Sequence, residues 1–269
     1  MSLRVAITGS SGRMGQTLLE AVIADVGFTL YAALDQPSLA TGGDAGASFG
    51  KLTGVHITHQ LESLQGADVL IDFTRPAASL IYLETCVAYG VNMVIGTTGF
   101  SDAEKQIITR AAQHIAIVFA PNMSVGVNLL IKLVELTART LDRDYDIEIV
   151  ETHHRHKVDA PSGTALRLGE AAAQASGRTL PKDAVYGRQN GERVPHSIGF
   201  ASLRGGDVVG DHTVMFAGRG ERLELTHKAS SRDTFALGAL HAAQFLQDKN
   251  KGLFDMQDVL DVKRLINGV

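Results

Sequence analysis

The sequence has very little cysteine and no tryptophan. Cys86 is the single cysteine among 269 residues, which excludes an internal disulfide and a zinc site built from cysteines. A basic excess is also missing, because 25 Lys and Arg residues stand against 29 Asp and Glu residues and the net charge is −4. Nucleic-acid-binding proteins normally carry a positive balance, so the composition argues against nucleic acid as a partner.

Membrane-spanning and secretory patterns are missing as well. The long uncharged stretch over residues 115–131 is interrupted by Pro121 and by three polar residues, which makes it a poor membrane span. The first residues lead directly into an apolar segment without the pattern of a secretory signal. With 45% hydrophobic and 20% charged residues, we expect a cytoplasmic protein with a substantial core and no membrane partner.

Short apolar runs alternate with helical patterns in the first half of the chain. One helix is expected to begin near Pro76, a residue type suited to a first helical turn. Another is expected after Ser101 and Glu104, which form a capping-box pattern. The alternation predicts an α/β fold with a doubly wound, Rossmann-type parallel sheet. The runs expected to form its strands, buried on both faces, are residues 4–8, 28–34, 67–73, 92–96 and 115–120.

The pattern changes after residue 123. A helical pattern over 125–140 and a strand pattern over 146–150 are followed by a loop and by a helix from about Gly163. The tail over 232–248 is predicted to be helical, and a short last helix is expected from Leu253 onward. Consecutive strands without helices between them indicate a second, α+β domain built on a mixed sheet. These strand-like runs are residues 196–203, 208–216 and 222–227.

A glycine-rich turn joins the first predicted strand to the first predicted helix. Gly9, Gly12 and Gly15 have the spacing G-x-x-G-x-x-G, which allows a tight turn and a close approach of a pyrophosphate to the helix N-terminus. Asp35 ends the second predicted strand, where a carboxylate can bind ribose hydroxyls. An ordinary glycine turn would explain the glycines alone. The strand, helix and acid together predict a dinucleotide-binding site.

Two further strand ends belong to the same predicted edge. The stretch Gly96-Thr97-Thr98-Gly99 follows the fourth predicted strand, and Ala120-Pro121-Asn122-Met123 follows the fifth. Ligands of open α/β sheets bind at the carboxyl ends of the strands, so both loops are predicted to face the nicotinamide end of the dinucleotide. Taken alone, each stretch is more often an ordinary turn than a binding loop.

Residues 151–165, ETHHRHKVDAPSGTA, concentrate three histidines with Arg155 and Lys157. Histidine exchanges protons near neutral pH, and a lysine stabilises developing negative charge. Ser162 is expected to cap a helix from Gly163, whose N-terminus suits a carboxylate. We interpret the stretch as an anion-binding catalytic loop. The alternatives are a solvated basic loop and a metal site, which the two cationic residues and the lack of cysteine disfavour.

These motifs resemble those of the 4-hydroxy-tetrahydrodipicolinate reductase (dihydrodipicolinate reductase) family. The resemblance covers essentially the whole chain in order, and the stretch ETHHRHKVDAPSGTA is its most specific part. The supporting stretches are VAITGSSGRMG, DFTRP, VIGTTGF, APNMSVGVN and THKASSR.

The resemblance implies a cytoplasmic homotetramer that reduces a small cyclic dicarboxylate with NADH or NADPH, in the diaminopimelate route to lysine. From the residue pattern of the histidine loop we expect no metal. Residues 1–123 with 235–269 would form the dinucleotide-binding domain, and residues 124–234 the substrate-binding and oligomerisation domain. The general acid falls on His153 and a second catalytic charge on Lys157. Substrate binding falls on His154, Gly163 and Thr164. The implied dinucleotide contacts are Gly9, Ser10, Ser11, Gly12, Arg13, Met14, Asp35, Gly96, Thr97, Thr98, Ala120, Pro121, Asn122 and Met123.

The implied chemistry agrees with the residue pattern. Loss of the substrate's 4-hydroxyl leaves a conjugated imine, and hydride addition to its far carbon gives an enamine that must be protonated. An acid is therefore required, and His153 is the candidate. Two substrate carboxylates explain the surplus of cationic groups. Arg232 is a further candidate for pairing with a carboxylate, although it also suits an ordinary surface position.

One position departs from the family pattern and bears on the choice of cofactor. Many members carry an arginine after the ribose-binding acid, where it can hold the 2′-phosphate of NADPH, but this chain has Gln36. We therefore expect NADH to be preferred, with NADPH usable if Arg13 or Arg75 reaches the phosphate.

Two other functions fit a dinucleotide site. One is a different two-domain dehydrogenase acting on an amino or hydroxy acid, which only the histidine loop separates from the first interpretation. The other is a catalytically silent redox sensor. A sensor would not need His153 and Lys157, and it would usually carry a basic DNA-binding element.

Overall fold

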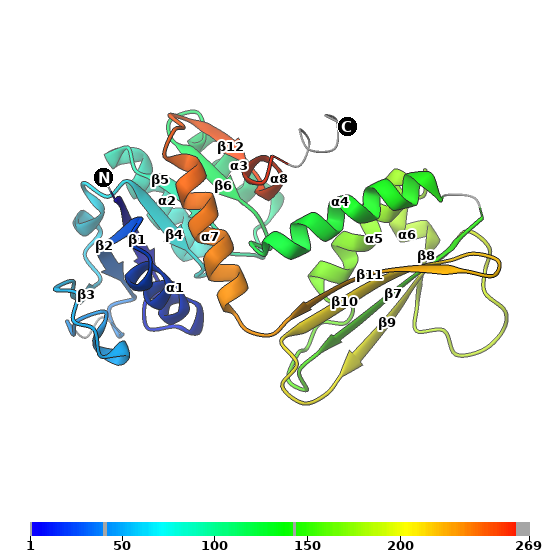
Figure 1. The fold of residues 1–269 in the computed structure, drawn as a ribbon. Coiled ribbons are helices and arrows are strands. Elements are labelled where there is room, and N and C mark those ends of the chain that lie inside the picture. Colours follow the sequence, from blue (N-terminus) through cyan, green and yellow to red (C-terminus); the bar gives the residue numbers. More distant parts are fainter. Residues whose placement is uncertain (1, 40–41, 142–143, 262–269) are drawn as a thin grey trace. The chain divides into compact units, whose positions relative to one another are not determined.

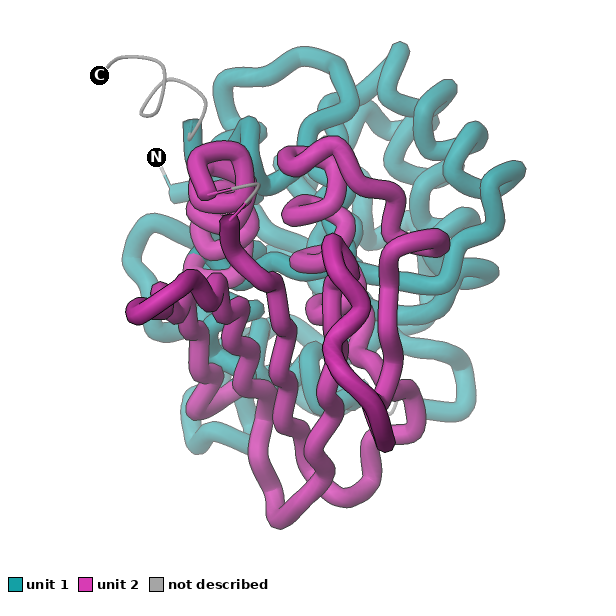
Figure 2. Tube along the Cα trace, turned by 90° about the vertical axis from the view of Figure 1, so that its right-hand side faces the viewer, with its two compact units in different colours: residues 1–125, 232–269 teal, residues 126–231 magenta. Residues whose placement is uncertain are grey.

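The computed structural model describes residues 2–39, 42–141 and 144–261. It divides into two compact units, unit 1 with residues 1–125 and 232–269 and unit 2 with residues 126–231 (Figure 2). Each unit has a sheet and a hydrophobic core of its own. The chain therefore leaves unit 1 once and returns to it near Arg232.

Unit 1 is built on a seven-stranded sheet with the order β12-β6-β5-β4-β1-β2-β3. All its pairings are parallel, and β1 lies between β2 and β4, where the strand order reverses. Crevices for ligands open outside the carboxyl ends of strands at such a reversal. The strands are β1 (Leu3–Thr8), β2 (Phe28–Leu34), β3 (Ile57–Thr58), β4 (Val69–Asp72), β5 (Asn92–Ile95), β6 (Ala116–Phe119) and β12 (Gly252–Phe254).

Helices cover both faces of this sheet (Figure 1). Val5 and Ile7 of β1 pack in one core with α1 and α7. Ala6, between them, packs in the other core with α2 and α3. Successive strand residues point to opposite faces, which explains why these strands are apolar throughout. The doubly wound parallel sheet is confirmed. The helices are α1 (Arg13–Ala24), α2 (Pro76–Tyr89), α3 (Asp102–Ala111), α7 (Asp233–Leu246) and α8 (Met256–Val259).

The ends of two helices follow their sequence signals. Pro76 occupies the first turn of α2, where its missing N–H leaves no intrahelical bond unmade. The Glu104 amide donates to Ser101 Oγ at 3.3 Å, and the Ser101 amide donates to Glu104 Oε2 at 2.7 Å, which completes a capping box. The short last helix expected from Leu253 onward is present as α8 but begins only at Met256, because residues 252–254 pair with β6 as an edge strand. The last residues, 262–269, lie outside the described chain.

Unit 2 has a mixed five-stranded sheet with the order β11-β10-β7-β9-β8. β7 is parallel to β9 and antiparallel to β10, which confirms the predicted mixed sheet. Ile147 and Ile149 of β7 pack with α4 and α5 in its core. The elements are α4 (Val125–Thr140), β7 (Asp146–His153), α5 (Gly163–Ala175), α6 (Leu180–Asp183), β8 (Ala184–Tyr186), β9 (Ile198–Arg204), β10 (Gly210–Ala217) and β11 (Arg222–Ala229).

None of the helices in the described residues combines the length and the apolar character needed to cross a bilayer.

Candidate active site

The glycine turn after β1 is closely packed. Gly9 has a left-handed φ of +65°, and a Cβ atom on Gly15 would lie 2.0 Å from the Gly9 carbonyl oxygen. The Gly12 amide donates to that same oxygen at 2.9 Å. Side chains at Gly9 and Gly15 would therefore strain the turn or push α1 away from it. The backbone is free to approach a ligand at the start of α1, where the first N–H groups have no intrahelical partner.

Asp35 lies against this turn. Its carboxylate accepts hydrogen bonds from the Ser11 amide at 2.7 Å and from the Gln36 amide at 2.8 Å, and the residue is buried. A cavity of about 390 Å³ opens beside it in unit 1. The predicted residues Gly9, Gly12 and Asp35 are brought together there with Gln36 and Arg75. The other lining residues are Leu39, Phe73, Thr74, Ala78 and Tyr82.

The remaining predicted dinucleotide contacts lie in the loops after β5 and β6 and in the glycine turn. Gly96, Thr97 and Thr98 follow β5, and residues 120–123 follow β6, so both stretches lie at the carboxyl edge of the sheet. Ser10 is less available for hydrogen bonds to a ligand than its position in the glycine turn indicates. Its hydroxyl donates to the Ile7 carbonyl at 3.1 Å and its amide to the Leu34 carbonyl at 3.1 Å. Arg13 and Met14 begin α1.

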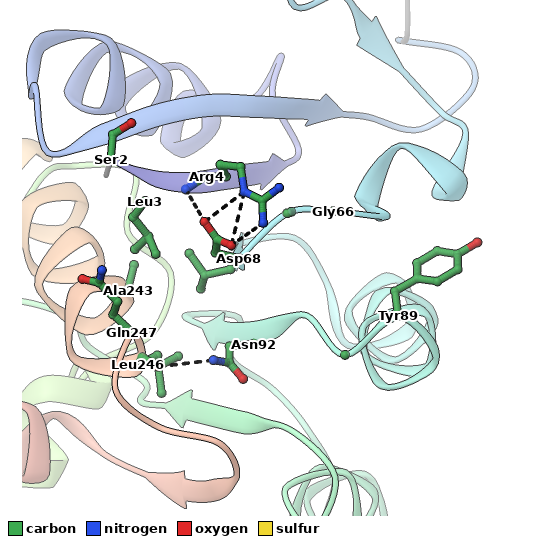
Figure 3. Close-up of a pocket in the computed structure, with 13 residues that line it drawn as sticks. Ser2, Leu3, Arg4, Gly66, Asp68, Tyr89, Asn92, Ala243, Leu246 and Gln247 are labelled. Carbon is green, nitrogen blue, oxygen red and sulfur yellow. Dashed lines mark hydrogen bonds and ion pairs between the residues drawn. The ribbon is translucent and has the colours of Figure 1, made fainter.

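A second cavity in unit 1, of about 490 Å³, lies at the opposite edge of the same sheet. Arg4 and Asp68 face each other there with a shortest N–O distance of 2.7 Å, and Asn92 donates to the Leu246 carbonyl at 3.2 Å (Figure 3). Their charges and amide donors thus already have partners within the protein. The cavity also lies at the amino ends of β1 and β4, away from the edge at which parallel sheets bind ligands.

In unit 2, β7 carries the first histidine of the cluster. The strand continues three residues beyond its predicted end, so Glu151 and His153 lie on the strand and share its buried face. His153 Nδ1 is hydrogen-bonded to Glu151 Oε2. Arg204 holds the same carboxylate with two nitrogen–oxygen contacts of 2.9 and 2.8 Å. The arrangement leaves Nε2 of His153 as the nitrogen free to exchange a proton.

The Glu151 carboxylate also reaches the start of α5. The Ser162 amide donates to Glu151 Oε1 at 3.2 Å, and Ser162 Oγ accepts from the Ala165 amide at 3.2 Å as the helix cap. Gly163 is exposed, and a side chain there would meet nothing within 4 Å. One carboxylate thus ties the histidine to an open helix N-terminus, as suits the binding of an anionic substrate group beside His153.

The electrostatics follow from this arrangement. Burial acts to raise the pKa of Glu151, but hydrogen bonds from Arg204, Ser202 and His153 outweigh it and bring the pKa to about 2. Burial lowers the pKa of His153, while Glu151 acts in the opposite direction. The charges of Lys157 and Arg204 lower it further. Glu151 is therefore an anion at neutral pH, and His153 releases its proton more readily than an exposed histidine does.

A second buried histidine, His212, lies beside His153. The two rings meet edge to face with centroids 5.1 Å apart, and His212 Nε2 is 3.0 Å from Ser162 Oγ. Burial is the main cause that lowers the pKa of His212 to about 4, and the neighbouring His153 adds to the effect. His212 is thus neutral at pH 7 and supports His153 and the cap of α5 without adding charge.

The other predicted catalytic and substrate-binding residues are more dispersed. Lys157 Nζ contacts Asp159 Oδ1 at 2.7 Å, and its charge is close enough to His153 to affect the pKa of that residue. His154 and Thr164 are half-buried in unit 2. Arg232 belongs to unit 1, where it precedes α7. Across residues 2–39, 42–141 and 144–261, no three His, Cys, Asp or Glu side chains form a group suited to a metal ion.

The residues of this arrangement that were missed from the sequence include Glu151, Arg204 and His212. The alternation Ile147, Ile149, Glu151, His153 is a signal for the first, because every second residue of a strand shares a face. Arg204 and His212 come from β9 and β10 and reach the site only through the sheet register, in which His153 is paired with Arg204 and Glu151 with His212.

Comparison with known proteins gives matches over both halves of the chain. Residues 3–123 match the family model described as dihydrodipicolinate reductase, N-terminus, and residues 126–260 match the model described as dihydrodipicolinate reductase, C-terminus. A 4-hydroxy-tetrahydrodipicolinate reductase of Thiobacillus denitrificans is 62% identical over 98% of this chain and 100% of its own length. Another, from Nitrosomonas eutropha, is 59% identical over 97% of this chain and 99% of its own.

A solved structure of a dihydrodipicolinate reductase is also similar to this chain. The dipicolinate-bound dihydrodipicolinate reductase from Paenisporosarcina sp. TG-14 is 28% identical, with a TM-score of 0.76 over 96% of this chain and 99% of its own. An amine dehydrogenase from Mycobacterium smegmatis, at 12% identity and a TM-score of 0.61, covers 94% of each chain and shares the fold alone.

Proposed function

The chain belongs to the dihydrodipicolinate reductase family, and we propose that it reduces its substrate with His153 as the general acid, Lys157 as a second catalytic charge and NADH as the preferred hydride donor. The reaction is the NAD(P)H-dependent reduction of 4-hydroxy-tetrahydrodipicolinate to tetrahydrodipicolinate, with loss of water, in the diaminopimelate route to lysine. The observation that carries the proposal is the buried Glu151–His153 pair beside the open start of α5.

Unit 1 has the features that a dinucleotide requires. The lack of side chains at Gly9 and Gly15 lets the turn pack closely against Thr74 and the start of α1, and Asp35 lines the adjoining cavity with a carboxylate able to accept from ribose hydroxyls. We assign the dinucleotide to Gly9–Met14, Asp35, Gly96–Thr98 and Ala120–Met123, with Ser10 contributing shape rather than hydrogen bonds. When bound, the reduced nicotinamide supplies the hydride.

Two residues beside Asp35 bear on the choice of cofactor: Gln36 supports a preference for NADH, and Arg75 would permit some use of NADPH. Both line the cavity beside Asp35, and the Asp35 carboxylate would repel a 2′-phosphate that carries nearly two negative charges. Gln36 offers hydrogen bonds without charge. Arg75 is the cation that would allow some use of NADPH, and Arg13, exposed at the start of α1, is a second.

Unit 2 supplies the proton and holds the substrate. Hydride addition to the conjugated imine moves electrons toward the ring nitrogen, and the resulting enamine takes a proton from His153 Nε2. Glu151 orients the ring through Nδ1 and stabilises its protonated form, and Arg204 keeps that carboxylate ionised. Lys157, His154, Gly163 and Thr164 are assigned to the substrate carboxylates, with Arg232 as a further candidate.

A homotetramer completes the proposal. Helices α4, α5 and α6 lie on one side of the unit 2 sheet (Figure 1). On the other side Val150, Thr213 and Met215 are only half-buried and Leu203 is 54% exposed. A sheet face that leaves Val150, Met215 and Leu203 partly open to solvent is suited to an interface between subunits. Light scattering coupled to gel filtration tests it, and a monomeric mass would contradict it.

The function itself is tested by following the loss of nicotinamide absorbance with enzymatically generated 4-hydroxy-tetrahydrodipicolinate. We expect turnover with NADH and slower turnover with NADPH. Amino and hydroxy acids, assayed with the oxidised dinucleotides, are the matched control. Turnover of those acids without reduction of the cyclic dicarboxylate would favour the alternative dehydrogenase, and dinucleotide binding without any turnover would favour the sensor.

A further inference from the structure

Asp72 is a buried carboxylate at the carboxyl edge of the unit 1 sheet. It is the last residue of β4 and is 0% exposed. Four hydroxyl groups donate to it. Thr8 and Thr74 bond Oδ1 at 2.7 and 2.6 Å, Thr97 bonds Oδ2 at 2.8 Å, and Ser79 bonds Oδ2 as well. No ion pair to Asp72 occurs in the described part of the chain, so these hydroxyls replace the water that the carboxylate loses on burial.

The four donors come from separate segments that meet at this edge. Thr8 ends β1 and immediately precedes Gly9 of the glycine turn. Thr97 immediately follows Gly96 in the loop after β5. Ser79 comes from the first turns of α2. Two of the three loops assigned to the dinucleotide, the glycine turn and the loop over residues 96–98, therefore begin at or beside a residue that is hydrogen-bonded to Asp72.

The two residues after Asp72 pack against the same loops. A Cβ atom on Gly96 would lie 2.3 Å from Cε1 of the Phe73 ring, and one on Gly9 would lie 3.1 Å from the Thr74 methyl group. Phe73 and Thr74 also line the cavity beside Asp35. The stretch Asp72-Phe73-Thr74 thus holds the two loops by the hydrogen bonds that Asp72 accepts and by the side-chain packing of the next two residues.

From this juxtaposition we infer that Asp72 is a positioning residue for the dinucleotide. It holds the glycine turn and the loop over residues 96–98 in their binding conformation before the ligand arrives, so that less ordering is needed on binding. The inference rests on the proposed function, because it concerns the loops assigned to the cofactor. Asp72 itself faces the four hydroxyls and acts only through them.

The direction of the hydroxyl hydrogens makes the two carboxylate oxygens important. Each oxygen of Asp72 accepts from two hydroxyls, so all four hydroxyls donate toward it. In an Asp72→Asn variant, the amide nitrogen would meet two of those donors, and they would have to turn away. A variant of nearly equal volume therefore disrupts the network without leaving a cavity.

The test compares Asp72→Asn with Asp68→Asn. Asp68 lies just before β4, at the other edge of the sheet, and is paired with Arg4 at 2.7 Å, so its loss weakens unit 1 without touching the loops. The measurements are the Kd for NADH by calorimetry, the Tm, and amide hydrogen exchange of residues 9–14 and 96–98 in the ligand-free protein. We expect Asp72→Asn to raise the Kd about tenfold or more and to speed exchange in both loops. Asp68→Asn should lower the Tm and leave the Kd within about twofold.

If Asp72→Asn does not fold, Thr8→Val and Thr8→Ser replace it. Valine removes the buried hydroxyl at nearly constant shape, whereas serine keeps it. Thr8→Val should therefore raise the Kd for NADH, and Thr8→Ser should keep the Kd near its wild-type value. An Asp72→Asn protein with wild-type Kd and wild-type exchange, or equal losses of affinity in the Asp72 and Asp68 variants, would overturn the inference alone. A wild-type chain that bound neither NADH nor NADPH would overturn the proposed function and this inference with it.

Discussion

Replacing Glu151 by glutamine should change both the rate and its dependence on pH. In the wild type, His153 must be protonated to donate, so kcat falls as the pH rises through its pKa. Glu151 is the group that raises that pKa, whereas burial and the charges of Lys157 and Arg204 lower it. Without the carboxylate charge only the lowering influences remain. The fall in kcat should therefore move to lower pH in Glu151→Gln.

The size of the effect follows from the bonds that are lost. Glu151 accepts from His153, from the Ser162 amide and from Arg204, whose contacts are 2.9 and 2.8 Å. A glutamine has one acceptor oxygen for these donors. Because general acids contribute about 10²–10⁴-fold to the rate, we expect kcat at neutral pH to fall by about 10²-fold. Removing one partner of a buried ion pair costs about 3–5 kcal/mol of folding free energy. The loss in Glu151→Gln should lie at or below that range, because the glutamine keeps one acceptor oxygen and the Arg204 side chain is 19% exposed to water.

The assay is the pH profile of kcat, normalised to folded enzyme and recorded well below the Tm. Glu148→Gln is the matched control, because Glu148 lies on the same strand but on its other face and pairs with Arg188 and Arg193. The control should lose stability and keep the wild-type profile. An unchanged profile in Glu151→Gln, or the same shift in both variants, would refute the role given to Glu151.

Three further variants test separate parts of the site. Thr164→Val removes a hydroxyl from the start of α5 at nearly constant volume, and losing one hydrogen bond to a substrate carboxylate, about 1.5–3 kcal/mol, should raise the KM for the dicarboxylate tenfold or more; an unchanged KM would contradict its role. Gly210→Ala places a Cβ atom 3.0 Å from His153 Nε2 and should lower kcat, whereas Gly205→Ala, with nothing within 4 Å, should not; equal rates would show that Nε2 acts elsewhere. Gln36→Arg should improve kcat/KM for NADPH more than for NADH, with a gain that shrinks as salt screens the new charge pair; an unchanged ratio would show that residue 36 does not face the ribose.

Local signals in the sequence were sufficient for most of unit 1. The glycine turn and Asp35 are separated along the chain, but parallel strands bring their carboxyl ends to one edge, and the structure joins them through the Ser11 amide. The short strands β3, β8 and β12 gave no such signal. Two or three residues carry too little periodicity, and only their partners in the sheet make them strands.

The histidine cluster was predicted less completely. The sequence places His153, His154 and His156 side by side, whereas strand alternation directs only the first toward Glu151. Its other partners, Arg204 and His212, lie 51 and 59 residues further along the chain and meet it because β7 pairs with β9 and β10. Side chains that are adjacent only through sheet register leave no local pattern, so the orienting group of His153 required the structure.

Proton delivery by His153 in unit 2 is separate from dinucleotide binding in unit 1. Measuring kcat and the Kd for NADH on the same preparation of His153→Ala, with Lys157→Ala in parallel, tests this separation. We expect kcat to fall about 10²–10⁴-fold in each variant, while the Kd for NADH stays at its wild-type value. Wild-type turnover in His153→Ala, or a loss of NADH binding as large as the loss of rate, would contradict it.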